Sequence, residues 1–341
     1  MKINNLLEQL IASEHLTVSQ MHELMRACMN GELTDAQLAA FLVLMRRKGE
    51  TVEELTAAAQ VMMEFAHCID LGGDLIDIVG TGGDGKNTFN ISTISSFVAA
   101  AAGARVAKHG GRSVSGRSGS ADLLLQAGFE LHLTDEQLTQ CMQQCGISFL
   151  FAPHFHQAMQ YARNVRQQLG IRTLFNILGP LVNPARVKKQ VMGVFAQHWL
   201  EPLAKVLANL GRERVFVIHS RDGMDEVSIA SITDVVEYHQ GQFKNWSIDP
   251  KEYGCFHATL DEIIVKSPNE SLALAEEVLS GQQGPARDIV LLNAAAALHC
   301  AELAESYAQA VEKARIAIDS GEAARRFTGL KELTRTLTGK S

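Results

Sequence analysis

The stretch LIDIVGTGGDGKNTFNISTISSFVAAAAGA, residues 75–104, changes within one loop from an apolar run to a helix-forming run. Residues 75–79 are typical of a short buried strand, and residues 94–104 favour a helix. The glycines between them let the main chain approach an anion closely, and the N–H groups that begin the helix favour negative charge there. The stretch therefore predicts a strand, a phosphate-binding loop and a helix in succession. The alternative is a glycine-rich connection that only turns the chain.

A second polar run, KHGGRSVSGRSGSAD at residues 108–122, also follows an expected strand and precedes a helical pattern. Two strand-to-helix loops in succession meet at the same edge of a parallel sheet, where the strands end and where such sheets bind ligands. The two loops are therefore expected to hold two ends of one polyanion. A solvated flexible loop is the alternative for the second run.

Short apolar runs alternate with helical patterns through most of the chain. The expected strands cover residues 75–79, 104–108, 148–152, 190–195 and 214–220. From about residue 270 the pattern is mostly helical, and the most apolar helix, residues 286–303, is expected to lie buried at the sheet. This alternation predicts an α/β fold with a mostly parallel central sheet flanked by helices.

The first 67 residues carry three capping boxes, each followed by helical apolar spacing. The boxes pair Thr17 with Gln20, Thr34 with Gln37 and Thr51 with Glu54. We expect a small α-helical domain at residues 1–70, with a helical contribution from about 160–185, and a large α/β domain at residues 71–341. Short helices of this kind need a partner surface, which the large domain or a second subunit would supply.

Composition excludes two classes of partner. The net charge is −7, whereas binding to a nucleic-acid backbone requires a broad basic surface. No apolar run is long enough to span a membrane, and the N-terminal residues lack the order of a signal peptide. We therefore expect a cytoplasmic protein with no nucleic-acid and no membrane partner.

Six cysteines are scattered along the chain, and without an export signal free thiols are expected. Cys141 and Cys145 lie four residues apart on an expected helix, close in sequence to His154 and His156. A transition-metal site is one interpretation. We prefer structural residues, because zinc sites usually show tighter pairs.

Two further features point to a small anionic ligand. Asp225 and Glu226 stand side by side after an expected strand, and paired carboxylates suit Mg²⁺ bound to phosphate oxygens; a solvated acidic turn is the alternative. Arg166 could clamp a carboxylate with two hydrogen bonds. On a helical stretch it could equally be a surface residue.

Five motifs in this order and spacing make the chain resemble the anthranilate phosphoribosyltransferases, enzymes of tryptophan biosynthesis. The motifs are GTGGDGxNTFNIST, KHGxRSVSxxSGSAD, FLFAPxxHxAM, VRxxLGxRTxFNxLGPLxNPA and GMDEVS. The resemblance covers nearly the whole chain. It implies transfer of phosphoribosyl from 5-phospho-α-D-ribose 1-diphosphate to the amine of anthranilate, with release of diphosphate.

The same resemblance implies roles for individual residues. The sugar-diphosphate site would comprise Gly80, Thr81, Gly83, Asp84, Thr88, Asn90, Ser92, Thr93, Lys108 and Ser120. The anthranilate site would comprise Gly80, His109, Gly111, Arg166 and Gly179, with His109 as a candidate general base. Ser92, Asp225 and Glu226 would hold Mg²⁺, with two ions per monomer. A homodimer through the N-terminal helices is implied, and an anthranilate synthase component is a further candidate partner.

The chain departs from the family pattern at two positions, since Gly111 replaces an asparagine and Gly116 a serine. The missing amide predicts weaker or differently placed anthranilate binding. Two other functions remain as alternatives. A pyrimidine nucleoside phosphorylase shares the fold but has no need of the acidic pair, and a nucleic-acid-binding relative would carry a basic groove.

Overall fold

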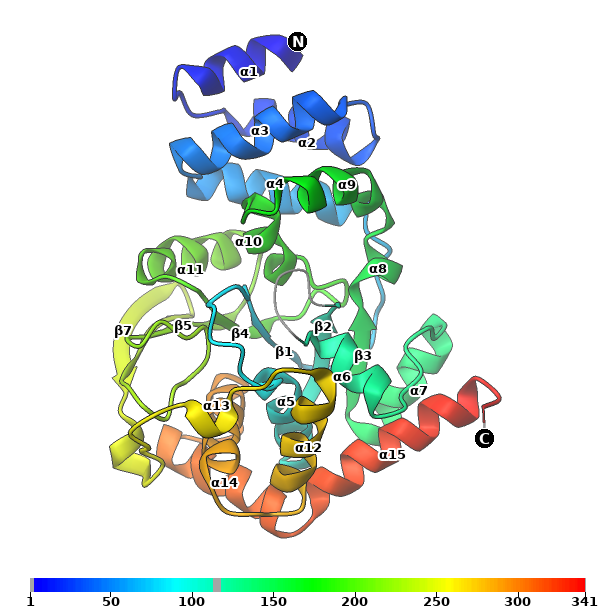
Figure 1. The fold of residues 1–341 in the computed structure, drawn as a ribbon, viewed down its shortest axis with the longest axis vertical. Coiled ribbons are helices and arrows are strands. Elements are labelled where there is room, and N and C mark those ends of the chain that lie inside the picture. Colours follow the sequence, from blue (N-terminus) through cyan, green and yellow to red (C-terminus); the bar gives the residue numbers. More distant parts are fainter. Residues whose placement is uncertain (1–2, 113–117, 341) are drawn as a thin grey trace.

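The computed structural model of the chain describes residues 3–112 and 118–340. Seven strands form one sheet in the order β3-β2-β1-β4-β5-β6-β7 (Figure 1). The strands are β1 (Leu75–Gly80), β2 (Arg105–Gly110), β3 (Ile147–Phe151), β4 (Lys189–Gly193), β5 (Arg214–Ser220), β6 (Thr233–His239) and β7 (Gln242–Ile248). Strands β1 to β5 pair in parallel, whereas β6 and β7 are antiparallel. The predicted mostly parallel sheet is confirmed.

All five strands expected from the sequence are present, within one or two residues at each end. The β6–β7 hairpin was not predicted. Gln240 and Gly241 connect its strands with φ angles of 49° and 80°, and positive φ at both central residues is the requirement of a tight hairpin turn. The hairpin extends the parallel sheet by two antiparallel strands at one edge.

The two faces of the sheet bury different hydrophobic clusters, as the two-residue period of a strand requires. Val191 of β4 and Phe216 of β5 lie in the cluster that contains the long helix α13 (Pro285–Cys300) and α5 (Ile91–Ala101). Their neighbours Met192 and Val217 lie in the cluster on the opposite face, which contains α11 (Leu200–Asn209). The prediction that residues 286–303 form a buried helix at the sheet is thus confirmed.

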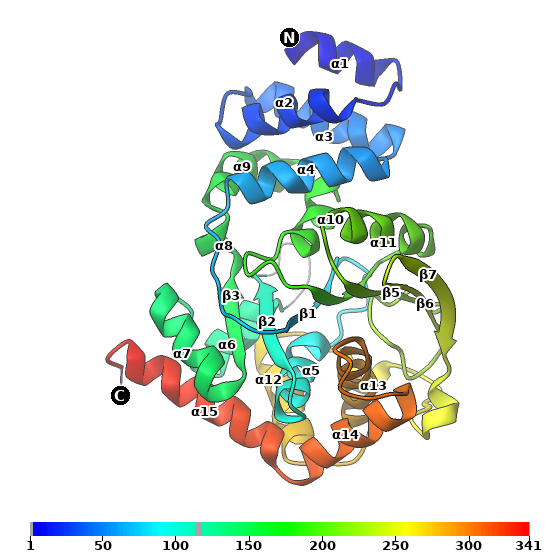
Figure 2. The same cartoon turned by 180° about the vertical axis from the view of Figure 1, so that it is seen from behind.

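The second cluster continues into a helical bundle at one end of the molecule (Figures 1 and 2). Its helices are α1 (Ile3–Ile11), α2 (Val18–Met29), α3 (Asp35–Lys48), α4 (Val52–Glu64), α9 (Gln160–Leu169) and α10 (Leu174–Leu181). All three predicted capping boxes are present at α2, α3 and α4. The division of the chain at residue 70 stays a prediction.

The remaining helices surround the first cluster at the other end of the molecule (Figure 2). They include α6 (Ser120–Gln126), α7 (Asp135–Cys145), α12 (Pro268–Leu279), α14 (Tyr307–Asp319) and α15 (Glu322–Leu337), while the short α8 (Ala152–Phe155) follows β3. Among the described helices, none is both long and apolar enough to cross a membrane.

The order of the strands places a binding crevice between β1 and β4. The chain moves from β1 to β2 and β3 on one side, and returns to β4 and β5 on the other. At such a reversal the loops that follow neighbouring strands diverge, and ligands bind at the carboxyl ends of those strands. Both glycine-rich runs and the acidic pair follow strands of this part of the sheet.

Candidate active site

The first glycine loop is anchored to the ends of two other strands. The N–H of Thr81 donates to the main-chain oxygen of Gly193 at 2.9 Å, and its hydroxyl accepts from the N–H of Phe195 at 3.1 Å. The N–H of Gly82 donates to Oδ2 of Asp225 at 2.6 Å. The loop after β1 and the acidic pair after β5 are therefore in direct contact, although Gly82 and Asp225 are 143 residues apart in the sequence.

Two glycines make room for the acidic pair. A Cβ atom on Gly80 would lie 2.5 Å from Oδ2 of Asp225, and one on Gly193 would overlap the main-chain oxygen of Asp225. Only residues without a side chain allow this approach at the ends of β1 and β4. The close packing fixes Asp225 at the crevice between these strands.

Burial and nearby negative charge raise the pKa of both carboxyl groups of the acidic pair, Asp225 and Glu226. Burial, followed by the charge of the neighbouring Asp84, raises the pKa of Asp225 to about 7. Burial, followed by the charge of Asp225, raises the pKa of Glu226 well above its usual range, and the N–H of Ser92 donates a hydrogen bond that opposes the rise. A buried carboxyl group, Asp225, and two partly exposed ones, Asp84 and Glu226, therefore lie close enough together for their charges to interact.

The positive charge of Lys108 acts on this acidic group and opposes the rise in the pKa of Glu226. Its side chain is 2% exposed, and its Nζ donates to the main-chain oxygen of Ile78 at 2.6 Å and to Oγ of Ser92 at 3.3 Å. Burial lowers the pKa of Lys108, while the charges of Asp77 and Glu226 raise it. Lys108 thus lies between Asp77, on which the charge of Arg212 also acts, and Glu226 of the acidic pair.

The donor set fits a hard divalent cation. Asp84, Asp225 and Glu226 offer carboxylate oxygens, and Ser92 offers a hydroxyl oxygen beside them. Oxygen ligands of this kind are those that Mg²⁺ takes, usually together with phosphate oxygens of a substrate. A bound cation would also favour the ionised carboxylates and so remove the cost of burying them.

Asn90 joins the two glycine-rich loops. Its Nδ2 donates to the main-chain oxygen of Ser118 at 3.1 Å, and its Oδ1 accepts from the hydroxyl of Ser118 at 2.8 Å. The hydroxyl of Ser271 on α12 also donates to Oδ1 at 2.8 Å. The expectation that both loops meet at one edge of the sheet is confirmed, and Asn90 is the residue that connects them.

His109 lies on the next strand of the crevice, at the end of β2. It is 4% exposed, and its Nε2 is buried with no hydrogen-bond partner among the described residues. Burial, followed by the neighbouring His156 and Lys108, lowers the pKa of His109 well below its usual value, and the main chain of Gly179 opposes this. The imidazole is therefore neutral at pH 7, and its free nitrogen is available to a ligand.

Helix α10 brings the expected anthranilate residues to the same region. Phe175 and Gly179 are four residues apart and so share one face of α10. The guanidinium of Arg166 lies 5.4 Å from the centre of the Phe175 ring, and Gly179 interacts with His109. No described carboxylate pairs with Arg166, whose pKa is lowered by burial. A carboxylate ligand would supply the missing partner.

Gly111 has room for a side chain among the described residues. Of these, a Cβ atom at this position would meet only Cβ of Ala152, at 3.8 Å, and the φ of Gly111 is not in the left-handed region. The site therefore has room for the asparagine that the family pattern carries at this position. Gly116, the other position that departs from the family pattern, lies outside the residues that the structure describes.

The other expected residues lie on the same loops. Thr88 forms a β-bridge with Ile264, and Gly83 approaches the side chain of Arg172. The hydroxyl of Thr93 is buried without a described partner, and Ser120 begins α6. These positions surround the crevice. The structure describes no direct ligand contact for any of them.

Three functional positions escaped the sequence analysis. Asp77 is fully buried in β1, where its carboxylate accepts from the N–H of His109 at 3.2 Å and from Nδ2 of Asn183 at 2.8 Å. Asn293 on α13 accepts from the N–H of Val227 at 2.8 Å and donates to its oxygen at 2.9 Å, which orients the acidic loop. Asp77 is a charged residue within the apolar run of residues 75–79, and this could have marked it as a candidate site residue.

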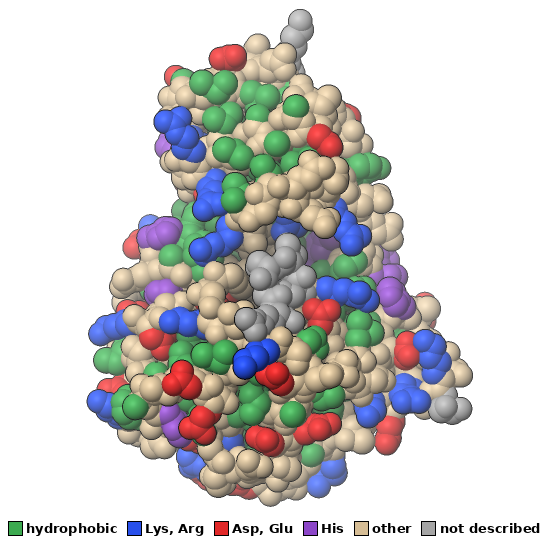
Figure 3. Space-filling model, in the orientation of Figure 1, with side chains coloured by type: hydrophobic (Ala, Val, Ile, Leu, Met, Phe, Trp, Pro, Cys, Tyr) green, Lys and Arg blue, Asp and Glu red, His purple; other side chains and the backbone are tan. Residues whose placement is uncertain are grey.

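Arg172 is the third such position. Its guanidinium lies 4.3 Å from the centre of the Phe195 ring, and its side chain passes beside Gly83. Figure 3 shows Lys and Arg side chains gathered where the helical bundle meets the α/β part of the molecule. Arg172 thus adds positive charge next to the first glycine loop.

The six cysteines are free, as expected. Cys141 and Cys145 are buried, and burial is the main cause that raises the pKa of both thiols, that of Cys141 to about 12. Neither belongs to a described group of possible metal ligands. They are packing residues of α7.

The whole chain is similar to known proteins. Residues 4–66 match a family model described as "Glycosyl transferase family, helical bundle domain", and residues 72–324 match "Glycosyl transferase family, a/b domain". An anthranilate phosphoribosyltransferase of Legionella pneumophila (strain Paris) is 63% identical over 341 residues, which cover all of this chain and 99% of that protein.

Solved structures agree with the sequence relatives. The anthranilate phosphoribosyltransferase of Thermus thermophilus superposes with a TM-score of 0.90 at 40% identity, covering 96% of this chain and 99% of the other. That of Saccharomyces cerevisiae, in complex with PRPP and Mg, has a TM-score of 0.90 at 26% identity and covers 98% of both chains. The chain belongs to the anthranilate phosphoribosyltransferases, enzymes of the glycosyl transferase family.

Proposed function

We propose that this chain transfers phosphoribosyl from 5-phospho-α-D-ribose 1-diphosphate to the amine of anthranilate and releases diphosphate. The observation that carries the proposal is the group of neighbouring carboxylates at Asp84, Asp225 and Glu226, of which Asp225 is buried, placed where two glycine loops meet. Such a group needs a cation, and a diphosphate ester of a sugar brings oxygens that complete the coordination of that cation.

The residues at the diphosphate end bind and neutralise the leaving group. Departure of diphosphate leaves positive charge on the sugar ring, so catalysis depends on stabilising the leaving group and on positioning the amine. Mg²⁺, two ions in our proposal, supplies charge that stabilises the leaving diphosphate, with Asp84, Asp225, Glu226 and Ser92 to hold it. The glycine-loop N–H groups and Lys108 bind phosphate oxygens.

Residues on the helical side hold the acceptor. The guanidinium of Arg166, which pairs with no described carboxylate, binds the carboxylate of anthranilate. Gly179 lies beside the aromatic ring, and Gly80 lies where anthranilate meets the sugar diphosphate. The neutral His109 offers Nε2 to the amine as a hydrogen-bond acceptor. Because burial disfavours its protonated form, His109 orients the amine and takes its proton only late in the reaction.

The assembly of the protein follows from its exposed apolar residues. Ile11, Val18 and Val43 are 55%, 45% and 39% exposed, and all three lie on the first three helices. We propose that they are covered in a homodimer of a cytoplasmic enzyme, with residues 1–70 as the smaller domain. An anthranilate synthase component is a second partner to be tested by co-purification.

The proposal is tested by the fluorescence of anthranilate. We expect fluorescence to fall when the sugar diphosphate and Mg²⁺ are both present, and to persist when either is omitted. Asp225→Asn and Glu226→Gln keep the shape of each side chain while removing its charge, and we expect both to lose activity by about 100-fold or more. Full activity in both variants would refute the assignment of the metal site.

A further inference from the structure

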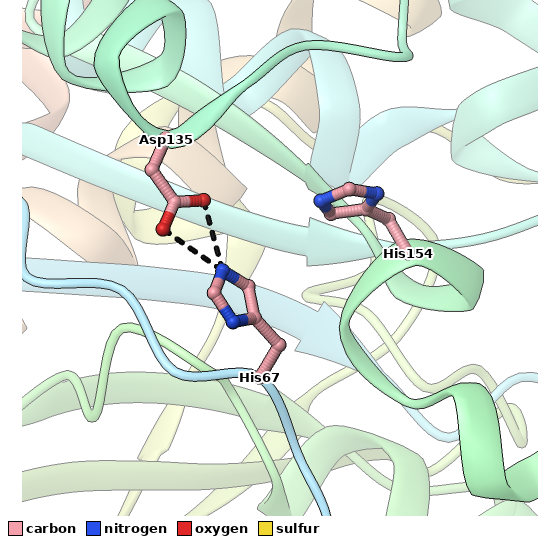
Figure 4. A group of neighbouring side chains, drawn as sticks. All are labelled: His67, Asp135 and His154. Carbon is pink, nitrogen blue, oxygen red and sulfur yellow. Dashed lines mark hydrogen bonds and ion pairs between the residues drawn. The ribbon is translucent and has the colours of Figure 1, made fainter.

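A second group of possible metal ligands lies outside the crevice, at the outer side of β3. His67 belongs to the segment that links α4 to β1, Asp135 is the first residue of α7, and His154 lies in α8. Figure 4 shows the three side chains facing one another from these three separate segments. Their ligand atoms all lie within 4.8 Å of one another.

The surrounding contacts hold the two imidazoles in place. The ring of His67 stacks on Phe155, with centres 5.8 Å apart and planes at 15°, and the main-chain N–H of His67 donates to the main-chain oxygen of Phe155 at 2.9 Å. His154 packs edge-on against the same ring at 5.1 Å. Phe155 itself is 1% exposed. The two imidazoles therefore pack on a buried aromatic residue, although His67 is exposed and Asp135 and His154 are partly exposed.

His67 and Asp135 already interact. Nε2 of His67 lies 2.8 Å from Oδ2 and 3.0 Å from Oδ1 of Asp135. In a tetrahedral zinc site two such ligand atoms lie about 3.3 Å apart. His67 and Asp135 would move apart by about half an ångström for a metal ion to replace the proton between them, and the ligand atom of His154, within 4.8 Å of theirs, would approach by up to about 1.5 Å.

A cavity opens beside the two histidines. It has a volume of about 370 Å³ and is lined by Phe65, His67, His154, Phe155 and Gln157. It is large enough to admit a hydrated ion and to leave a water molecule in the coordination shell. The cluster and the cavity are two independent features that meet at the same histidines.

We propose that His67, Asp135 and His154 bind one divalent transition-metal ion of the zinc class, with a fourth position open to the cavity. Imidazole is a ligand of borderline softness, and two imidazoles with one carboxylate suit zinc and cobalt better than Mg²⁺. The oxygen ligands of Asp225 and Glu226 have the opposite preference. The two sites therefore select different metals.

The proposed ion would connect three parts of the fold. The segments that contain His67 and His154 are both links between the sheet and the helical bundle, one before β1 and one after β3. Asp135 belongs to α7, which packs against β3. An ion bound to all three would stabilise the folded protein according to its concentration and affinity.

Co²⁺ is the probe, because its visible absorption reports tetrahedral coordination by nitrogen and oxygen. The full-length protein, stripped of metal with a chelator, is titrated with Co²⁺ in the presence of excess Mg²⁺, and zinc is then added in competition. His154→Ala removes one ligand and leaves the His67–Asp135 pair. His132→Ala is the matched control, since His132 is exposed and, like His154, packs edge-on against a phenylalanine, in this case Phe151 at 5.4 Å.

We expect one tetrahedral Co²⁺ in the wild type and in His132→Ala, displaced by zinc and not by Mg²⁺. Removing a residue that only hydrogen-bonds to a metal ligand weakens metal binding by about 10-fold to 100-fold. His154→Ala removes a ligand itself, so we expect it to weaken Co²⁺ binding at least as much. Zinc should raise the Tm of the wild type and not of His154→Ala. Equal binding by both variants, or no tetrahedral spectrum in the wild type, would overturn the proposal.

Discussion

A Cβ atom on Gly193 would overlap the main-chain oxygen of Asp225, so the acidic loop rests directly on the end of β4. Gly80 stands in the same relationship to the carboxylate of Asp225, from the end of β1. These two glycines determine how deeply the acidic pair sits in the crevice. The position of the metal site therefore depends on the absence of two side chains as much as on the ligands themselves.

Gly193→Ala is expected to displace Asp225 and to lower Mg²⁺-dependent activity strongly. The main chain cannot rotate away as a flexible side chain could, so overpacking should also lower the free energy of unfolding by about 1–3 kcal/mol. Gly329→Ala is the control, because Gly329 lies in α15 with nothing within 4 Å of an added Cβ. Turnover and urea unfolding measure both effects. Wild-type activity in Gly193→Ala would contradict this account of the loop.

Gly111→Asn is expected to improve the binding of anthranilate. An added Cβ would meet only Ala152, and a net hydrogen bond contributes about 0.5–1.5 kcal/mol, which is about a twofold to tenfold lower KM. The KM for the sugar diphosphate should not change. Gly111→Ala separates the effect of the amide from that of bulk, and an equal improvement in both variants would show that no hydrogen bond is gained.

Arg166→Gln is expected to raise the KM for anthranilate. A hydrogen bond to a charged group contributes about 1.5–3 kcal/mol, which corresponds to about 10-fold to 100-fold. Arg163→Gln changes an exposed arginine on the same helix and should leave the KM unchanged. For an aromatic amine without a carboxylate, the KM should be high and should be the same in the wild type and in Arg166→Gln. A large difference in that KM between the two proteins would assign Arg166 another role.

Acid is expected to destabilise the metal-free protein through His109. Burial lowers the pKa of His109 well below 6.5 in the folded state, so the unfolded chain binds the proton more readily. The stability that the neutral imidazole contributes is present above pH 6.5 and is lost as the pH falls below that value. Urea unfolding at neutral pH and about one unit below 6.5 measures the slope. His109→Gln should reduce this slope, and an unchanged slope would mean that His109 does not titrate as stated.

The sequence was sufficient to predict the elements that depend on local pattern. Apolar runs located strands β1 to β5, and the capping boxes at Thr17, Thr34 and Thr51 located three helices, because these signals act within a few residues. The β6–β7 hairpin was missed, since Gln240 is an unusual residue for a turn that needs positive φ. There is a second reason. No helix lies between β6 and β7, so the alternation of strands and helices that located β1 to β5 is absent there.

The sequence predicted those residues of the candidate site that belong to recognisable motifs, and not the others. The motifs indicated Asp225, Glu226 and Lys108, whose burial and contacts support a binding site. Asp77 and Asn183 were missed because they meet across 106 residues, and no local pattern reports such a contact. The preference for structural roles of Cys141 and Cys145 agrees with their burial, and His154, which is close to them in sequence, lies beside His67 and Asp135 instead.

The central claim is tested most directly by measuring anthranilate consumption and diphosphate release in the same reaction. The account predicts that the two amounts are equal, and that no anthranilate is consumed and no diphosphate is released when the sugar diphosphate or Mg²⁺ is left out. Release of diphosphate without loss of anthranilate would contradict the proposed acceptor. Cleavage of a pyrimidine nucleoside by inorganic phosphate, with no reaction of anthranilate, would contradict the proposed function as a whole.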